Sequence, residues 1–220
     1  MAADEKKDLK TSNRTKCRIC RRSGVKLFLR GEKCLSQKCP MVRKPYPPGP
    51  KAKKRTRGLS EYGKELREKQ KLKNWYNLEE RQFRKYVKEI LGARSRASDA
   101  RTRLIETLES RLDNVIFRLG FAPSRAAARQ MVSHGHFTVN DRPIDIPGYL
   151  VRKGDKVSLV PGSAGKTVFK KLPGALKKHN PPSWLQFKAD KMEAKVVGLP
   201  NLEEAAPPAE LSSIFEFYSR

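Results

Sequence analysis

Four cysteines, Cys17, Cys20, Cys34 and Cys39, have the spacing in this chain that most clearly indicates chemistry. They follow the pattern C-x2-C-x13-C-x4-C, and a short C-x2-C pair presents two sulfurs to one tetrahedral metal ion. The loop that they close has too little apolar surface to fold alone. The spacing predicts a structural Zn²⁺ site, with an iron–sulfur cluster, two disulfides or free thiols as alternatives. The basic neighbours are expected to lower the thiol pKa and to favour thiolate ligands.

A large positive charge surrounds this cluster and extends along the chain. There are 49 Lys and Arg against 23 Asp and Glu, a net charge of +26, whereas about 2–8 is enough to keep a small domain soluble. Such an excess repels itself unless a polyanion, usually nucleic acid, neutralises it. No stretch approaches the roughly 20 apolar residues of a membrane-spanning helix, and residues 1–10 lack the apolar run of a signal peptide. We therefore expect a cytoplasmic nucleic-acid-binding protein with no membrane partner.

The segment that follows the cysteines is both basic and proline-rich. "RKPYPPGPKAKKRTRG", residues 43–58, contains no acidic residue, and its prolines favour an extended chain over a helix. It is either a disordered linker or a strand laid along phosphates. Its candidate RNA-binding residues are Arg43, Lys44, Lys51, Lys53, Lys54, Arg55 and Arg57.

Helices are expected to position the next set of basic side chains. Residues 60–76 read as a charged helix, and residues 77–92 as an amphipathic one with Asn77 and Glu80 as a capping box and Gly92 as its end. Phe83, Tyr86, Val87 and Ile90 recur at helical spacing, and a basic stripe lies two residues, about 200°, away from them. That stripe consists of Arg81, Arg84, Lys85 and Lys88.

A mixed helix–strand segment follows. An apolar stripe from Leu104 to Leu119 ends at Gly120, and a short helix begins at the cap Ser124 and ends at Gly135. The Asn140-Asp141 pair predicts a tight turn between two strands, and Lys156–Val160 reads as a third strand after a Gly-Asp turn.

Several long stretches carry a family resemblance. "SEYGKELREKQKLKNWY", "ERQFRKY", "RLDNVIFRLGFAPSRAAARQMVSHGHFTVN" and "PPSWLQF" resemble small-subunit ribosomal proteins of the bacterial S-four type, in the cysteine-containing form. The resemblance runs from about Cys17 to the end of the chain. It implies binding to 16S ribosomal RNA early in subunit assembly, neighbouring ribosomal proteins as partners, and a place at the channel through which mRNA enters, with an effect on decoding accuracy. Asp141 stands where the family usually has glycine, and many members lack the cysteines.

The resemblance and the periodicities together predict an α+β fold. We expect a mobile tail over 1–15, a zinc-binding module over 16–45 and a basic helical domain over 46–110. Residues 111–175 should form an inserted helix–sheet RNA-binding module like the one named after the family. Residues 176–220 should pack back on the helical domain.

Candidate RNA-binding residues of this module fall in the stretch most similar to the family. They are Arg111, Arg118, Ser124, Arg125, Arg129, His134 and His136. We expect Arg125→Ala with Arg129→Ala to weaken RNA binding by about 2–4 kcal/mol. Thermal stability should barely change, because neither residue belongs to the apolar stripe.

Other functional classes find less support. "GSAGKT", residues 162–167, has Val160 where a phosphate-binding loop needs glycine, and the two histidines of "HGH" lack a third metal ligand nearby. No catalytic constellation is present, so an enzyme is not expected; an RNA-modifying enzyme that shares the module is the alternative. A zinc-dependent DNA-binding factor would need a helix after the cysteines, which the prolines oppose.

Overall fold

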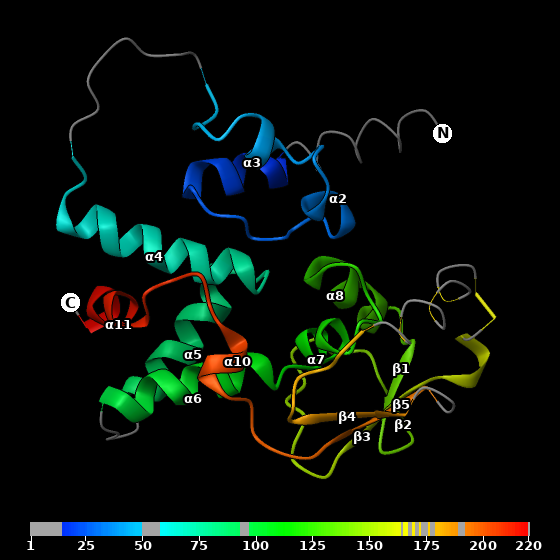
Figure 1. Ribbon diagram of the computed structural model, residues 1–220. Coiled ribbons are helices and arrows are strands. Elements are labelled where there is room, and N and C mark those ends of the chain that lie inside the picture. Colours follow the sequence, from blue (N-terminus) through cyan, green and yellow to red (C-terminus); the bar gives the residue numbers. More distant parts are fainter. Residues whose placement is uncertain are drawn as a thin grey trace. The chain divides into compact units, whose positions relative to one another are not determined.

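The computed structural model of the chain describes residues 15–49, 58–92, 97–163, 165–166, 169, 172, 176, 179–188 and 192–219 (Figure 1). It contains two compact units: Met1–Lys88 with Pro207–Arg220, and Glu89–Ala206. Helices and an antiparallel sheet confirm the predicted α+β class. None of the helices among these residues is long and apolar enough to cross a membrane.

The first unit is helical and carries the four cysteines. The side chain of Ser60 caps its longest helix by accepting a hydrogen bond from the backbone N–H of Gly63 at 3.3 Å, as expected of a serine in that position. The elements are a helix over residues 15–23, α2 (Glu32–Leu35), α3 (Pro40–Arg43), α4 (Glu61–Trp75), α5 (Glu80–Gly92), whose residues from Glu89 on fall in the second unit, and the C-terminal α11 (Leu211–Ser219).

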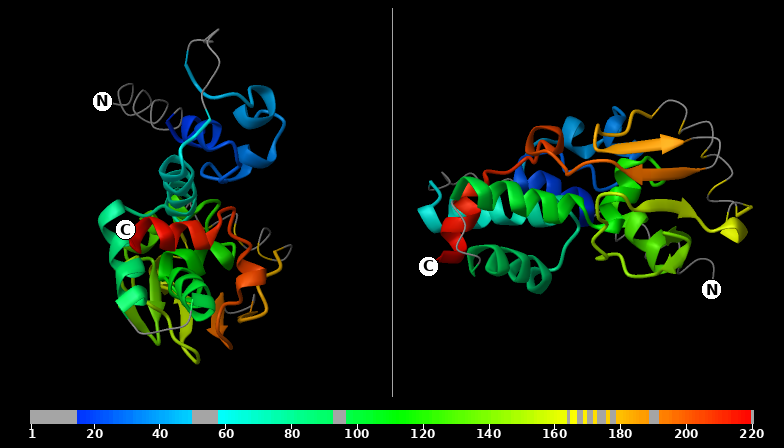
Figure 2. Two further views of the ribbon diagram at one scale, coloured as in Figure 1. Left: turned by 90° about the vertical axis from the view of Figure 1, so that its left-hand side faces the viewer. Right: turned by 90° about the horizontal axis from the view of Figure 1, so that it is seen from below.

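Helix α11 lies along α4, although the two are far apart in the sequence (Figures 1 and 2). The rings of Tyr62 and Phe217 are 5.4 Å apart, and the ammonium of Lys69 lies 4.4 Å from the centre of the Phe217 ring. Leu211 and Ile214 are buried. The end of the chain therefore closes the core of the first unit.

The second unit combines helices with a five-stranded antiparallel sheet. Its strand order is β2-β1-β3-β5-β4. The elements are α6 (Ala97–Glu109), α7 (Leu112–Arg118), α8 (Arg125–Ser133), β1 (Phe137–Val139), β2 (Arg142–Ile144), β3 (Lys156–Leu159), a 3₁₀ turn (Pro161–Ser163), β4 (Leu185–Lys188), β5 (Glu193–Val196) and α10 (Leu202–Ala205).

The β1–β2 hairpin has the predicted turn. Asn140 and Asp141 have φ of 50° and 64°, the pair of positive values that a type I′ turn requires. Asparagine tolerates this conformation. The side chain of Asn140 also makes two hydrogen bonds: Nδ2 donates to Asp155 Oδ1 at 2.8 Å, and Oδ1 accepts from the N–H of Lys156 at 2.9 Å. The hairpin is thereby tied to the start of β3.

The sheet extends beyond the expected limits of the inserted module. Strand β5 pairs with β3, and β4 pairs with β5, so the stretch up to Ala206 belongs to this unit and only Pro207–Arg220 belongs with the helical one. The expectation that all of residues 176–220 pack on the helical domain is corrected accordingly. β4 and β5 cover apolar surface that the shorter module would leave exposed, because Leu185, Ala194 and Val196 are buried.

Helices α7 and α8 pack against this sheet to form the core of the second unit (Figure 2). The predicted apolar stripe is buried, but it is divided between α6 and α7 by a break at Ser110 and Arg111. The loop before β3 fills the break: the N–H of Leu112 donates to the carbonyl of Tyr149, and the N–H of Val151 to that of Ser110, each at 2.8 Å.

Candidate nucleic-acid interface

Helix α5 presents a basic face to solvent. Arg81, Arg84 and Lys85 are exposed, whereas Phe83 and Val87 are fully buried. The predicted opposition of a basic and an apolar stripe is therefore confirmed. Guanidinium and ammonium groups spaced along one exposed face suit contact with successive phosphates.

The start of α5 differs from the prediction. Asn77 has a positive φ of 54° and belongs to the turn after α4, and the helix begins at Glu80. The predicted capping box of Asn77 and Glu80 is therefore wrong, because the carboxylate of Glu80 accepts hydrogen bonds from other side chains. It accepts hydrogen bonds from Lys69 Nζ at 2.6 Å, Lys73 Nζ at 3.0 Å and Tyr218 Oη at 2.9 Å.

These bonds shift the pKa of two groups. Burial alone would raise the pKa of Glu80, but the hydrogen bonds from Lys69, Lys73 and Tyr218 outweigh burial and lower the pKa to about 2. Burial, followed by the bond to the Glu80 carboxylate, raises the pKa of Tyr218. The ionised carboxylate thus links α4, α5 and α11 within the first unit.

The basic segment after the cysteines begins at an exposed turn of helix. Arg43 ends α3 and Lys44 follows it, and both are exposed. The expectation that prolines prevent a helix here is corrected for one turn, because Pro40 occupies the first helical position, where its missing N–H has no role. Lys51, Lys53, Lys54, Arg55 and Arg57 lie outside the described residues.

The four cysteines line one small pocket. All four are free thiols, so the two-disulfide alternative is not realised, and Arg30, Leu29, Lys16, Pro40 and Met41 complete the lining. The pocket volume of about 10 Å³ is room for roughly one water-sized sphere. Arg30 Nη1 lies 3.5 Å from Cys17 Sγ. In the described part of the chain, no three His, Cys, Asp or Glu residues are arranged to hold a metal ion.

The pKa of two of these thiols moves opposite to the expectation. Burial raises the pKa of Cys20 and of Cys34, and the neighbouring cysteines add to the effect. Backbone hydrogen bonds at Leu27 and Arg30 oppose it only in part. The basic surroundings do not prevail, because burial disfavours the thiolate more than the neighbouring cations favour it.

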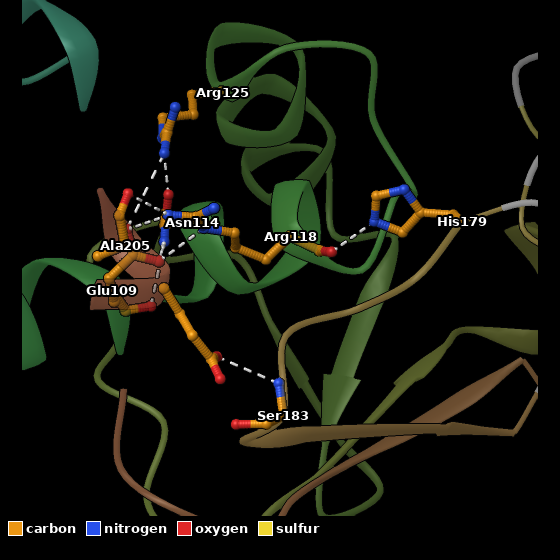
Figure 3. A network of polar contacts seen from close by, with 8 residues as sticks. Glu109, Asn114, Arg118, Arg125, His179, Ser183 and Ala205 are labelled. Atoms are coloured by element: carbon orange, nitrogen blue, oxygen red, sulfur yellow. Dashed lines mark hydrogen bonds and ion pairs between the residues drawn. The ribbon is translucent and has the colours of Figure 1, made fainter. Parts of the chain in front are cut away.

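In the second unit, arginines enter a polar network (Figure 3). Glu109, only 1% exposed, accepts from Arg118 Nε at 2.8 Å, Arg118 Nη2 at 2.9 Å and Asn114 Nδ2 at 2.6 Å. Arg125 Nε donates to Asn114 Oδ1 at 2.7 Å, and its guanidinium lies 4.5 Å from the centre of the Phe117 ring. The network joins α6, α7 and α8.

The same network extends to two later segments, one between β3 and β4 and one after β5 (Figure 3). Arg118 Nη2 also donates to the carbonyl of Ala205 at 3.1 Å, and the carbonyl of Arg118 lies 2.7 Å from His179 Nε2. His179 leaves no space at Gly120, where an added Cβ would stand 2.8 Å from the imidazole. Arg118 thus connects α7 to two later segments, through its side chain at Ala205 and through its carbonyl at His179.

Arg111 forms a second buried pair. It is 1% exposed and donates from Nε to Asp113 Oδ1 at 3.1 Å and from Nη2 to Asp113 Oδ2 at 2.7 Å. This two-pronged geometry is the strongest form of an arginine–carboxylate contact. The side chain of Arg129 lies near the same carboxylate, with Nη1 3.9 Å from Asp113 Oδ2, and remains 34% exposed.

The structure therefore corrects the predicted RNA-facing surface of this unit. Arg111, Ser124, Arg125 and His136 are buried, and Arg118 is engaged with Glu109. Ser124 is the predicted cap of α8, accepting from the N–H of Ala127 at 3.3 Å. Arg129 and His134 keep solvent access. The expectation that an Arg125 substitution leaves stability unchanged does not fit a side chain that is only 7% exposed.

The sequence analysis did not predict the roles of Glu109 and Asn114. For the carboxylates of this network the sequence did contain a signal: Glu109 and Asp113 directly follow Leu108 and Leu112, two leucines of the apolar stripe. A carboxylate beside a fully buried position is costly unless a cation pairs with it. The cations that meet this requirement are Arg111, which pairs with Asp113, and Arg118, which pairs with Glu109.

Two family models of known proteins match adjoining parts of the chain. A family model described as "Ribosomal protein S4/S9 N-terminal domain" matches residues 12–109, and one described as "S4 domain" matches residues 110–157. The boundary between the two models lies at the break between α6 and α7.

Relatives with one and the same name come from several bacteria. "Small ribosomal subunit protein uS4" of Thermus thermophilus is 46% identical over 204 residues, which are 93% of this chain and 96% of the relative. Proteins of that name from Caldicellulosiruptor bescii and Thermotoga maritima are 45% identical over 204 residues and 43% identical over 205 residues, with the same shares of each chain covered.

Proposed function

Because the chain belongs to the uS4 family of small ribosomal subunit proteins, we propose that it is a structural constituent of that subunit and binds its ribosomal RNA. The chain is not an enzyme, since the relatives that it matches over 93% of its length are named as constituents of the ribosome. The alternative of an RNA-modifying enzyme is therefore set aside.

One observation supports RNA binding more than any other. The net charge of +26 is accompanied by an exposed row of basic residues on α5, namely Arg81, Arg84 and Lys85. Packing cannot explain that row, because the opposite face of the helix supplies the core contacts. Phosphate neutralisation accounts for both the charge and its placement.

The finer proposal is that the protein clamps a junction of 16S ribosomal RNA helices and so nucleates subunit assembly. Each unit offers basic side chains to solvent: Arg43, Lys44 and the α5 row are exposed in the first, whereas in the second His134 is exposed and Arg129 is partly exposed. Folded RNA is recognised largely by shape, since its deep major groove excludes side chains. Cations on two rigid units can fix the angle between RNA helices, which an early assembly protein must do.

A role at mRNA is the second finer proposal. By resemblance, the basic segment over residues 43–57 lies near the channel through which mRNA enters, beside neighbouring ribosomal proteins, and contributes to decoding accuracy. Its exposed start at Arg43 and Lys44 agrees with contact to a polyanion. Neutralising these two residues should weaken the unwinding of structured messages and also reduce the salt slope for binding to small-subunit RNA.

Salt-dependent binding tests the RNA-binding function. If about six phosphates are neutralised, the logarithm of affinity for small-subunit ribosomal RNA should fall with the logarithm of salt with a slope near −4 to −5, at about 0.7–0.9 per contact. A footprint of the purified protein on that RNA, with and without a chelator, should locate the contacts. A slope near zero would contradict a mechanism based on phosphate contacts.

We also propose that the four cysteines hold one structural Zn²⁺. Four free thiols that line a single pocket are a donor set suited to this ion. Arg30 stands beside Cys17 and would offset the negative charge of bound thiolates. When bound, the metal would supply a cross-link between residues 15–23, α2 and α3, where little apolar surface is available.

Elemental analysis tests the metal proposal directly. We expect one equivalent of zinc in the native protein, and Cys34→Ser should lose it while residues 60–200 stay folded. Arg30→Gln should lower zinc affinity by about 10–100-fold, whereas Arg22→Gln, at an exposed arginine outside the pocket, should not. Native protein without metal and with four reactive thiols would exclude the site.

A further inference from the structure

Two segments far apart in the sequence gather basic groups at one end of the sheet. The turn after α8 carries His134, Gly135 with φ of 67°, and His136. The chain that leaves β3 folds back over it, because the N–H of Val160 donates to the carbonyl of His136 at 3.0 Å. Successive turns at Pro161–Ser163 and at Lys166 keep that chain close to the imidazole of His136.

His136 is the buried centre of this cluster. Its ring is 8% exposed and packs edge-on against Phe169, with ring centres 5.3 Å apart. Nδ1 lies 3.0 Å from Ser163 Oγ and 3.5 Å from Lys166 Nζ. The contact with an ammonium, which can only donate, suits a neutral ring that carries its proton on Nε2. His136 is thus a buried support beside the exposed ammonium of Lys166.

Positive groups surround that support. Lys166 and His134 are exposed, and the rings of His134 and His136 are 5.9 Å apart. Burial first, and then Lys166 and His134, lower the pKa of His136, as expected where cations converge. Among the described residues, no carboxylate lies within ion-pair distance of Lys166 or His134. Neither the ammonium of Lys166 nor the imidazole of His134 is thus paired with an acid in that part of the protein.

The chemistry of the cluster selects the ligand class. A metal cation is disfavoured despite the two imidazoles, because Lys166 Nζ stands next to Nδ1 of His136. An anion with several oxygens satisfies the remaining donors, which are the ammonium of Lys166 and an N–H of His134. We infer that Lys166 and His134, placed by the buried His136, form a phosphate-binding site that holds one backbone phosphate of bound RNA, an inference that rests on the proposed function for the identity of its ligand.

Histidine NMR signals test the site without RNA. The chain has three histidines, and His179 is hydrogen-bonded to Arg118 in another part of the same unit, so it is an internal control. Titrating the full chain with inorganic phosphate should shift the imidazole signals of His134 and His136 and leave those of His179 unchanged. Lys166→Gln should abolish the shifts. Equal, weak shifts at all three histidines would indicate an adventitious ion only and would overturn the proposal.

A second arm tests whether RNA supplies the phosphate. Lys166→Gln should weaken binding of the full chain to small-subunit ribosomal RNA by about tenfold and reduce the salt slope by about 1. Lys153→Gln is the matched control, because Lys153 is exposed at the opposite end of β3, and it should change affinity less than twofold. Equal affinities of the two variants would overturn the assignment to RNA. If the wild-type chain does not bind this RNA, the proposed function fails, while the histidine signals still decide whether the phosphate site exists.

Discussion

Helix α5 and the helix pair α7–α8 both carry arginines at helical spacing, yet the two regions use them in opposite ways. On α5, Arg81 and Arg84 are exposed above a fully buried apolar face. On the pair, Arg111 and Arg125 are 1% and 7% exposed and contact buried polar side chains. Only the first region resembles a ready surface for phosphates.

The difference comes from where the carboxylates lie. Glu109 and Asp113 are 1% and 4% exposed, and a buried carboxylate requires a cation because desolvation is expensive. On α5, the acidic residue Glu80 is already neutralised by Lys69 and Lys73 from α4. An arginine stays at the surface unless a buried acid needs it, so arginine position alone does not locate an RNA contact.

Removing a buried arginine should have the largest effect. Arg111→Ala leaves Asp113 buried without its two-pronged partner and should lower the free energy of unfolding by about 3–5 kcal/mol. Arg81→Ala should stay within about 0.5 kcal/mol of wild type. Denaturant unfolding reports the second unit, and so Arg111→Ala, through Trp184 in a Trp75→Phe background, and it reports the first unit, and so Arg81→Ala, through Trp75 in a Trp184→Phe background. Similar small losses for both variants would remove the distinction between the regions.

Separate substitutions should divide the roles of two arginines on α8. Arg125→Ala should destabilise the second unit by about 1.5–3 kcal/mol, the range for a hydrogen bond from a charged group. Arg129→Ala, at a side chain that is 34% exposed, should cost less than about 1 kcal/mol of stability and weaken RNA binding by about 1–2 kcal/mol. Filter binding alongside thermal unfolding checks both; equal destabilisation by the two variants would contradict the division.

The exposed face of α5 should behave in the opposite manner. Arg81→Ala with Arg84→Ala should leave stability unchanged and weaken RNA binding by about 1–2 kcal/mol, with the salt slope reduced by roughly 1.4–1.8 at 0.7–0.9 per phosphate. Lys188→Ala with Lys195→Ala removes equal charge from exposed positions of β4 and β5 and is the control. If that control changes the slope as much, overall charge rather than α5 governs binding.

The smallest effect is expected at Glu80, where the hydroxyl of Tyr218 donates at 2.9 Å. Tyr218→Phe should cost about 0.5–1.5 kcal/mol. The pKa of Glu80 is lowered to about 2, against about 4.3 in an unfolded chain. Its stabilising contribution is therefore complete above about pH 4.3 and is lost as the pH falls toward 2.

Acid unfolding of the first unit, followed through Trp75 in a Trp184→Phe background, measures this contribution. Wild type should lose stability between about pH 4.3 and 2, whereas Glu80→Gln should show less dependence on pH across that window. Parallel curves for the two proteins would show that Glu80 does not link α4, α5 and α11.

The amino-acid sequence alone determined the local structure and the class of the protein. The spacing of Phe83 and Val87 fixed which face of α5 is buried, and Asn140-Asp141 fixed the turn of the β1–β2 hairpin. Both depend on neighbours within a few residues, where helical period and turn conformation are decided. The excess of basic residues likewise indicated a polyanionic partner.

Only the tertiary structure decided which basic residues remain free for that partner. Arg118 meets Glu109 and Ala205, and His136 meets Ser163 and Lys166, across 9 to 87 residues of sequence. Likewise, β5 joins β3 from beyond the expected module. Burial of a charged group depends on whether a distant partner repays its desolvation, and neither side-chain spacing nor propensity contains that information.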